Sequence, residues 1–305
     1  MTRGIGETGV VEAIPEVVVA LFGVATHLAD PWFVFGSVGV IYLLAGDRIV
    51  DRPRHAGAVL ISLAVCGLAA TLLAKVLVAV PRPPAAAVPA PPPAVFPGIV
   101  DVWFRTVTTA SGFGFPSGHA VAATVLYGGI AHILDRPARS LRWGLAVAVI
   151  GIVSLSRVII QVHYVVDVVA GVVVGATVLW GVLQTGDRRT APDPALGLAL
   201  GMGLAVAAVG VAAFNGFETE VGEALITLSV AGGGSIGWRL CDGDEPALAP
   251  AAAIGTLAVG GGIVGVTYLV SGGGTVVAAA GLVTAWVVGA PSILDTGVAG
   301  KFKTF

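Results

Sequence analysis

Charged residues are scarce in this sequence. Asp, Glu, Lys and Arg make up 11% of the 305 residues, whereas a water-soluble domain usually carries about a quarter. The mean hydropathy is +0.95, and apolar runs of about twenty residues recur along the chain, each long enough to cross the hydrocarbon core of a bilayer. The shortage of charge excludes an ordinary soluble domain, and the recurring runs predict an all-α, polytopic membrane protein.

Cysteine and an excess of either charge are also lacking. The two cysteines, Cys66 and Cys241, fall in a predicted span and in a loop, so no disulfide framework is indicated. The formal net charge is −2 and the basic residues are too scattered to form a patch, so we expect no nucleic-acid partner. The N-terminus lacks the basic leader of a cleaved signal peptide, and we interpret it as mature.

The apolar runs predict about ten transmembrane helices. They cover approximately residues 13–28, 31–46, 57–80, 117–134, 142–158, 163–184, 195–214, 221–238, 249–270 and 275–293. We divide the chain into a membrane-embedded domain of six helices, residues 1–187, and a module of four helices rich in Gly, Ala and Val, residues 188–305. Because small residues let helices approach closely in lipid, we expect the second module to serve packing or homo-oligomerisation.

Basic residues are distributed unequally over this predicted topology. Twelve of the sixteen Lys and Arg residues fall on the side that holds both chain termini. Since cytoplasmic loops carry the excess of Lys and Arg, we expect both termini of this multi-pass cell-membrane protein to be cytoplasmic. The four remaining cations, Lys75, Arg82, Arg105 and Arg157, lie toward the outer side. For Arg105, which follows Trp103 and Phe104, we favour an interfacial anchor.

Two short motifs place ionisable side chains near the outer ends of spans. Lys75 lies in an apolar run and is followed by Arg82, seven residues later and so on the same face of a helix. A lysine at this depth marks a functional site or snorkels to the interface, and the residue alone leaves both readings open. The second motif is Pro116-Ser117-Gly118-His119. It opens a predicted helix, whose N–H groups and dipole favour an anion, and Gly118 lets the backbone approach a ligand.

The third motif contains Ser156-Arg157, then His163 and Asp167. Because residues at positions i and i+4 share a helix face, we expect Asp167 to hydrogen-bond one ring nitrogen of His163. That bond would orient the ring and leave its other nitrogen free for nucleophilic attack. A pair at this spacing is often only structural. The shared outer location of the three motifs favours a functional site.

The cations of these motifs indicate an anionic ligand. Lys75, Arg82 and Arg157 need a counter-ion, and we expect Asp167 to be the only acidic residue near them. Phosphate is the simplest choice, with two histidines as nucleophile and proton donor. A transporter of organic anions would also explain the cations, but it gives no reason for the histidines. His27, near the outer end of the first span, belongs to no motif, and we give it no role.

Together the three motifs resemble the signature of the type 2 phosphatidic acid phosphatase superfamily. This family includes lipid phosphate phosphatases, polyprenyl pyrophosphate phosphatases and, in soluble form, vanadium haloperoxidases. The motifs occur in order, match at every signature position and cover about residues 57–184. The resemblance implies a helical membrane phosphatase.

The resemblance also implies a role for each motif residue. His163 would attack phosphorus and form a phosphohistidine, with Asp167 orienting it, while His119 would protonate the leaving oxygen and then activate water. No metal or cofactor enters this scheme. The phosphate oxygens would be held by Lys75, Arg82, Ser117, Gly118 and Arg157.

A site at the outer ends of spans favours a substrate whose tails stay in the bilayer. We therefore expect hydrolysis of a lipid phosphomonoester or pyrophosphate, phosphatidic acid-like or polyprenyl, at the extracytoplasmic face. A lipid-linked phosphotransferase would use the same site with an alcohol in place of water. An inactive family member is a further alternative, against which the complete motif set argues. Eight prolines between residues 81 and 98 predict a semi-rigid connection that arches over the site or serves as an exposed spacer.

Overall fold

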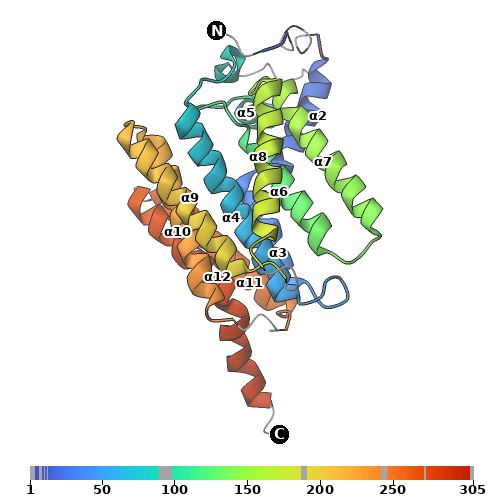
Figure 1. Cartoon of the computed structure of the whole chain (residues 1–305), viewed down its shortest axis with the longest axis vertical. Coiled ribbons are helices and arrows are strands. Elements are labelled where there is room, and N and C mark those ends of the chain that lie inside the picture. Colours follow the sequence, from blue (N-terminus) through green and yellow to red (C-terminus); the bar gives the residue numbers. More distant parts are fainter. Residues whose placement is uncertain are drawn as a thin grey trace.

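The computed structural model describes residues 4–6, 9, 11, 13–88, 98–186, 191–241, 246–270 and 273–302. Every regular element within these ranges is helical, and the helices pack side by side as an elongated bundle (Figure 1). In chain order they are α2 (Glu16–Thr26), η1 (His27–Ala29), α3 (Pro31–Leu44), α4 (Pro53–Val78), η2 (Pro84–Ala87), α5 (Gly98–Val107), α6 (Gly118–Ile133), α7 (Arg139–Ile159), α8 (Val165–Leu183), α9 (Pro194–Phe214), α10 (Glu218–Trp238), α11 (Pro250–Val270) and α12 (Gly273–Phe302). The all-α membrane protein predicted from the sequence is confirmed at this level.

Among the residues that the structure describes, six helices are long and apolar enough to cross a membrane on their own: α4, α7, α8, α9, α11 and α12 as far as Leu294. Helices also stand where the spans at residues 117–134 and 221–238 are predicted. However, α6 has only 16 residues, and α10 carries three glutamates in its first six positions. The structure therefore contains helices at the predicted places without establishing that ten of them are separate spans.

The first two predicted spans form one bent pair. With 11 and 14 residues, α2 and α3 are each too short for a hydrocarbon core of roughly 30 Å at about 1.5 Å per residue. They bend by 49° at the break between Ala29 and Pro31, and only together do they qualify as one candidate span. Pro31 occupies the start of α3, while Asp30 before it is extended. Figure 1 shows α2 toward one end of the bundle and α3 toward the other, so the pair crosses it once.

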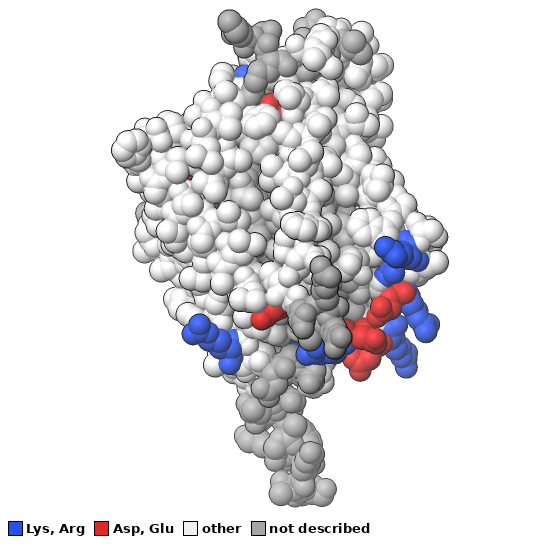
Figure 2. Space-filling model, viewed as in Figure 1, with Lys and Arg blue, Asp and Glu red and all other residues white. Residues whose placement is uncertain are grey.

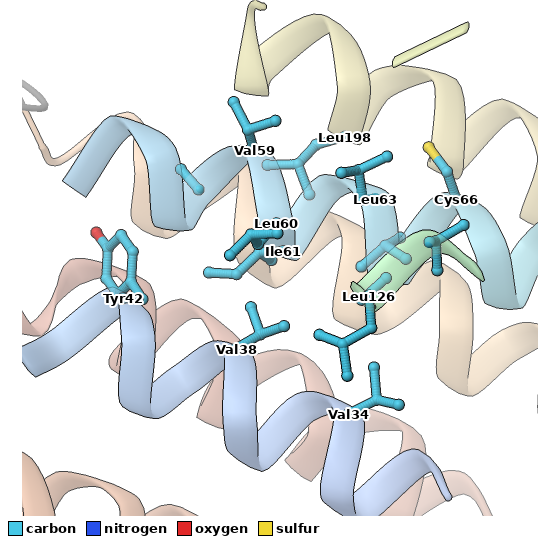
Figure 3. Packing of buried hydrophobic residues seen from close by; sticks show 14 of the residues in the cluster. Val34, Val38, Tyr42, Val59, Leu60, Ile61, Leu63, Cys66, Leu126 and Leu198 are labelled. Carbon is cyan, nitrogen blue, oxygen red and sulfur yellow. The ribbon is translucent and has the colours of Figure 1, made fainter. Parts of the chain in front are cut away.

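Helix α4 is the centre of the bundle. It packs against α3, α6, α8, α9 and α10, and Leu60, Leu63 and Val65 on it are almost completely buried. Figure 3 shows Val34 and Val38 of α3 directed toward this helix. Because lipid tails are as apolar as these side chains, close packing rather than escape from water holds such helices together.

Glycines on α8 bring it close to the beginning of α6. A Cβ at Gly171 would lie 2.6 Å from the carbonyl oxygen of Ser117, and a Cβ at Gly175 would lie 2.7 Å from Cβ of Thr124. Only glycine allows this approach. The spacing of four residues follows the small-residue pattern of tightly packed membrane helices. It sets the second and third motifs against each other.

The four C-terminal helices pack against the rest of the bundle. Helix α9 lies along α4, and α10 contacts α4, α9 and α12. Gly233 and Gly237 of α10 face the backbone of α12 at Gly281 and Ala285, so these small residues serve packing within the chain. The predicted division between residues 187 and 188 falls outside the described residues. Homo-oligomerisation through this module stays a prediction.

Charged side chains gather at one end of the bundle. Figure 2 shows Lys and Arg there together with Asp and Glu, while the face above them is almost free of charge. A hollow at this end is lined by Asp47, Arg48, Asp51, Asp135 and Arg136. This arrangement is typical of a protein whose uncharged middle lies in lipid.

Candidate active site

The residues predicted to form the site come together at the end of the bundle opposite the charged hollow. Lys75 and Arg157 lie in the last turns of α4 and α7, and His119 lies in the first turn of α6. A cavity of about 510 Å³ opens between these helix ends. Six of the eight predicted residues line it: Lys75, Arg82, Gly118, His119, Arg157 and His163. The other two, Ser117 and Asp167, are fully buried beside it.

His163 has both ring nitrogens engaged. It lies in the loop between α7 and α8 and is 3% exposed. Its Nε2 is 2.9 Å from Nη1 of Arg82, and its Nδ1 is 2.7 Å from the carbonyl oxygen of Gly114. Since a guanidinium can only donate, Nε2 accepts, and Nδ1 carries the hydrogen that it donates to Gly114. The lone pair on Nε2 therefore faces the cationic side of the cavity.

Burial and nearby charge keep this ring neutral. Burial first, and then the positive charges of Arg82, Arg157 and Lys75, hold the pKa of His163 well below its ordinary value of 6.5. A neutral imidazole with a lone pair on Nε2 is the form that can attack phosphorus.

The predicted hydrogen bond from His163 to Asp167 is not formed. Oδ2 of Asp167 is 3.6 Å from Nδ1 of His163, which is ion-pair distance but longer than a hydrogen bond. The same oxygen accepts the backbone N–H of Tyr164 at 3.0 Å, as part of a capping box. The prediction was wrong because α8 begins at Val165, after His163, so the two residues do not share a helix face. The carbonyl of Gly114 orients the ring instead.

Asp167 connects the second and third motifs through its backbone. Its carbonyl oxygen accepts the N–H of Ser117 at 2.9 Å. The N–H of Ser117 is therefore not available to a ligand. Within the described residues, Oγ of Ser117 has no hydrogen-bond partner. Gly118 follows at the cavity wall.

Arg82 reaches the site from a loop. Helix α4 ends at Val78, and Ala79 then takes a left-handed conformation, so the predicted shared helix face with Lys75 is wrong. Nε of Arg82 donates to the carbonyl of Ser111 at 2.8 Å, and Nη1 donates to that of Val162 at 3.1 Å. These carbonyls fix the guanidinium beside His163. Only the start of the proline-rich stretch, residues 81–88, is described.

The remaining two cations complete the cavity wall. Arg157 is 5% exposed, and its Nη1 donates to the hydroxyl of Thr26 on α2. Lys75 lines the cavity, which favours the functional reading over snorkelling. Three cations around one cavity supply fixed donors of the kind that an anion such as phosphate would require.

Residues 55–191 match the family model described as the PAP2 superfamily. This part of the chain is a PAP2 superfamily region. The matched region contains all three motifs and extends from the first turn of α4 to the segment after α8. No curated protein and no solved structure matches the chain. Membership indicates phosphatase-type hydrolysis of a phosphoester.

Parts of this PAP2 protein outside the matched region also reach the site. Nε2 of His119 is 2.8 Å from Oδ1 of Asp30, at the break between α2 and α3. Glu223 of α10 lines the cavity. The expectation that Asp167 is the only acid near the cations was therefore wrong. An acidic residue followed by proline between two apolar runs was a usable signal, since such residues within membrane segments are rare.

The far wall of the cavity is apolar. It is built by Val34 and Phe35 of α3, Leu68 of α4, Val125 of α6 and Ile226 of α10. The cavity thus joins a cationic end, made by the three motifs, to an apolar interior between four helices. Helix α10 gives the C-terminal module a direct place in it.

Proposed function

We propose that this PAP2 protein hydrolyses a lipid phosphomonoester or pyrophosphate, without a metal, through a phosphohistidine on His163. The observation that carries the proposal is the position of Nε2 of His163. Its lone pair faces Arg82 in a cavity that Lys75 and Arg157 also line. The nucleophile and the groups that bind phosphate therefore meet at one point.

In the first step an oxygen of the substrate phosphate replaces Nε2 of His163 as the acceptor of the hydrogen bond from Arg82. Lys75, Arg157 and the Gly118 N–H hold further oxygens, where negative charge is spread in the transition state. Nε2 of His163 then forms a bond to phosphorus as the bond from phosphorus to the lipid oxygen breaks. His119 gives its proton to that leaving oxygen. The ring of His163 becomes positive, and the Gly114 carbonyl stabilises it through the Nδ1 hydrogen bond.

In the second step water attacks the phosphohistidine. His119, now neutral, takes a proton from the water while a new bond forms between phosphorus and oxygen. The bond between phosphorus and Nε2 breaks, and inorganic phosphate leaves. An alcohol in place of water would yield the phosphotransferase reaction, which remains the alternative.

The apolar part of the cavity supports a lipid substrate. A headgroup bound by the cations would place its tail against the side chains of α3, α4, α6 and α10. Phosphatidic acid-like lipids and polyprenyl pyrophosphates both combine such a tail with terminal phosphate oxygens.

The charge distribution supports an extracytoplasmic site. Charged side chains gather at one end of the bundle (Figure 2), and the hollow lined by Arg48 and Arg136 lies near the start of α4, whereas the cavity lies at the end of that helix. By the positive-inside rule the charged end of the bundle faces the cytoplasm. If α2 and α3 cross once, α2 begins on the outer side, whereas α12 ends on the cytoplasmic side (Figure 1). This proposed topology differs from the expectation that both termini are cytoplasmic, and that expectation stays a prediction.

The test is phosphate release by the purified protein in detergent with EDTA. Phosphatidic acid, phosphatidylglycerophosphate and a polyprenyl pyrophosphate would be compared for the wild type, His163→Ala and a control, His132→Ala, at the other end of α6. We expect release that survives EDTA, falls by about 10³-fold or more in His163→Ala and is unchanged in the control. Full release by His163→Ala would contradict the phosphohistidine. If that variant transports a lipid phosphate without hydrolysis, the transporter alternative would be favoured.

A further inference from the structure

We propose that Asp30 is a positioning residue for His119, held in place by His27, Trp32 and Trp103. This inference rests on the proposed function, since it concerns the proton donor of that reaction. It assigns a catalytic task to the break between α2 and α3, which lies outside the region that matches the PAP2 family.

The carboxylate of Asp30 receives three N–H groups. Oδ1 accepts Nε2 of His119 at 2.8 Å. Oδ2 accepts Nε1 of Trp32 at 3.0 Å and Nδ1 of His27 in a short hydrogen bond. These partners come from α6, from α3 and from η1. A carboxylate with three donors stays an anion and keeps a fixed orientation.

The hydrogen positions follow from Trp103. Its indole N–H can only donate, and it lies 2.9 Å from Nε2 of His27. Nε2 of His27 therefore accepts, so its Nδ1 carries a hydrogen and donates to Asp30. A chain of bonds thus runs from α5 through His27 and Asp30 to His119. At the end of this chain of bonds, the carboxylate of Asp30 accepts the N–H of Nε2 of His119.

This bond fixes which nitrogen of His119 exchanges a proton. Nε2 keeps its hydrogen for Asp30, and Nδ1 is the atom that gives a proton to the leaving oxygen and later takes one from water. Asp30 itself remains a carboxylate throughout. Lys75, Arg82 and Arg157 line the same cavity, so a protonated His119 adds a fourth positive charge there. The negative charge of Asp30 compensates for it.

A purely structural role explains the contacts of Asp30 less well. Asp30 stands at the N-cap position of α3, where an aspartate usually accepts a backbone N–H of the first turn. Its side chain makes no such bond. It turns toward His119 instead. A metal site is not indicated either, because the described part of the chain contains no group of three His, Cys, Asp or Glu side chains that could hold an ion.

The experiment compares Asp30→Asn, His119→Asn, the double variant and a matched control, Asp101→Asn. Asp101 is a partly buried carboxylate on α5, two positions before Trp103, and it is not one of the residues bonded to Asp30. Each protein is assayed with dioctanoyl phosphatidic acid, whose leaving oxygen needs a proton, and with p-nitrophenyl phosphate, whose leaving group does not. Inhibition by inorganic phosphate reports whether the site is intact, and Asp30→Glu tests whether a carboxylate alone restores activity.

We expect Asp30→Asn to lose about 10²-fold in kcat on the lipid with little change in KM. With p-nitrophenyl phosphate it should release a stoichiometric burst of nitrophenolate and then turn over slowly, because the water step also needs His119. The double variant should be no worse than His119→Asn, since the two residues act as one unit. Inhibition by phosphate should stay within about threefold of wild type, and Asp30→Glu should recover part of kcat.

An unchanged kcat in Asp30→Asn would overturn the inference. So would equal losses on both substrates without a burst, or losses that add to those of His119→Asn. These results leave the proposed function standing if His163→Ala is inactive. A wild type that acts on neither substrate, or an active His163→Ala, would overturn the proposed function and this inference together.

Discussion

Arg82 donates a hydrogen bond to Nε2 of His163 over 2.9 Å, which places a guanidinium directly on the lone pair of that imidazole. The backbone carbonyls of Ser111 and Val162 hold the guanidinium there. If phosphate binds as we propose, it must come between the two side chains, so its binding would also free the Nε2 nitrogen that we propose as the nucleophile.

Replacing Arg82 with lysine should weaken phosphate binding although the charge is kept. An ammonium lacks the planar set of donors that can contact two carbonyls and a phosphate at once. We expect the inhibition constant for inorganic phosphate to rise by about tenfold or more. Arg105→Lys, on the exposed side of α5, is the matched control and should behave like the wild type. Equal inhibition of the two variants would contradict this role for Arg82.

Acid should destabilise the folded protein in part through His163. Because the pKa of His163 is lowered well below 6.5 on folding, the unfolded chain binds the proton first as the pH falls. Stability from this group is present above pH 6.5 and is lost below it, by at most about 1.4 kcal/mol per pH unit. Thermal unfolding in detergent between about pH 7.5 and about pH 5 should therefore depend less steeply on pH in His163→Gln. Parallel curves would show that His163 does not contribute.

Gly171→Ala should separate α8 from the start of α6. The new Cβ would meet the carbonyl oxygen of Ser117 at 2.6 Å, and backbone must move to relieve the contact. We expect a loss of about 1–3 kcal/mol in stability together with a loss of phosphatase activity. Gly181→Ala on the same helix has nothing within 4 Å of its Cβ and should leave both unchanged. Thermal unfolding and phosphate release measure the two effects.

Ile226→Phe should discriminate between lipid and small substrates. Ile226 lines the apolar part of the cavity on α10, so a larger side chain would obstruct a tail. We expect a higher KM for long-chain lipid phosphates and an unchanged KM for p-nitrophenyl phosphate. Leu225→Phe places the same side chain on a neighbouring exposed position and serves as the control. If both substrates are affected alike, the tail does not lie against α10.

Glu223→Gln should tighten the binding of phosphate. Glu223 lines the cavity together with Lys75 and Arg82, and its negative charge opposes an anionic ligand. Removal of that charge should lower the inhibition constant for inorganic phosphate by roughly several-fold, more at low salt than at high salt. Glu218→Gln, at the first position of α10, is the control. Weaker binding in Glu223→Gln would mean that Glu223 instead helps to order the cations.

The sequence located the groups that line the cationic end of the cavity. Lys75, His119 and Arg157 could be assigned because each lies at the end of an apolar run, and span ends on one side of a membrane meet at a common depth. The helices themselves followed from the same runs. The local hydropathy pattern was therefore sufficient to predict the helices and the residues at the cationic end of the cavity.

Other relationships depend on contacts between distant segments. Asp30 and His119 are separated by 89 positions, and no periodicity connects them. The predicted hydrogen bond between His163 and Asp167 was wrong for a local reason, because it depended on the residue at which α8 begins. Two apolar runs separated by Asp30 and Pro31 look like two spans, and the bend that makes α2 and α3 one candidate span leaves no mark on the hydropathy pattern.

The break at Asp30 also limits how the protein can change. Backbone without helical hydrogen bonds is tolerated at membrane depth only where protein or a cavity surrounds it, and here the cavity supplies that shelter. If Pro31 were replaced and α2 continued into α3 as one straight helix, Asp30 would change from an extended to a helical conformation. The side chains of α2 would then be rotated about the helix axis relative to those of α3, by about 100° for each residue that joins the helix. Asp30 would then turn away from His119. The bend in this span and the contact between Asp30 and His119 are thus one property of the chain, and selection on either acts on both.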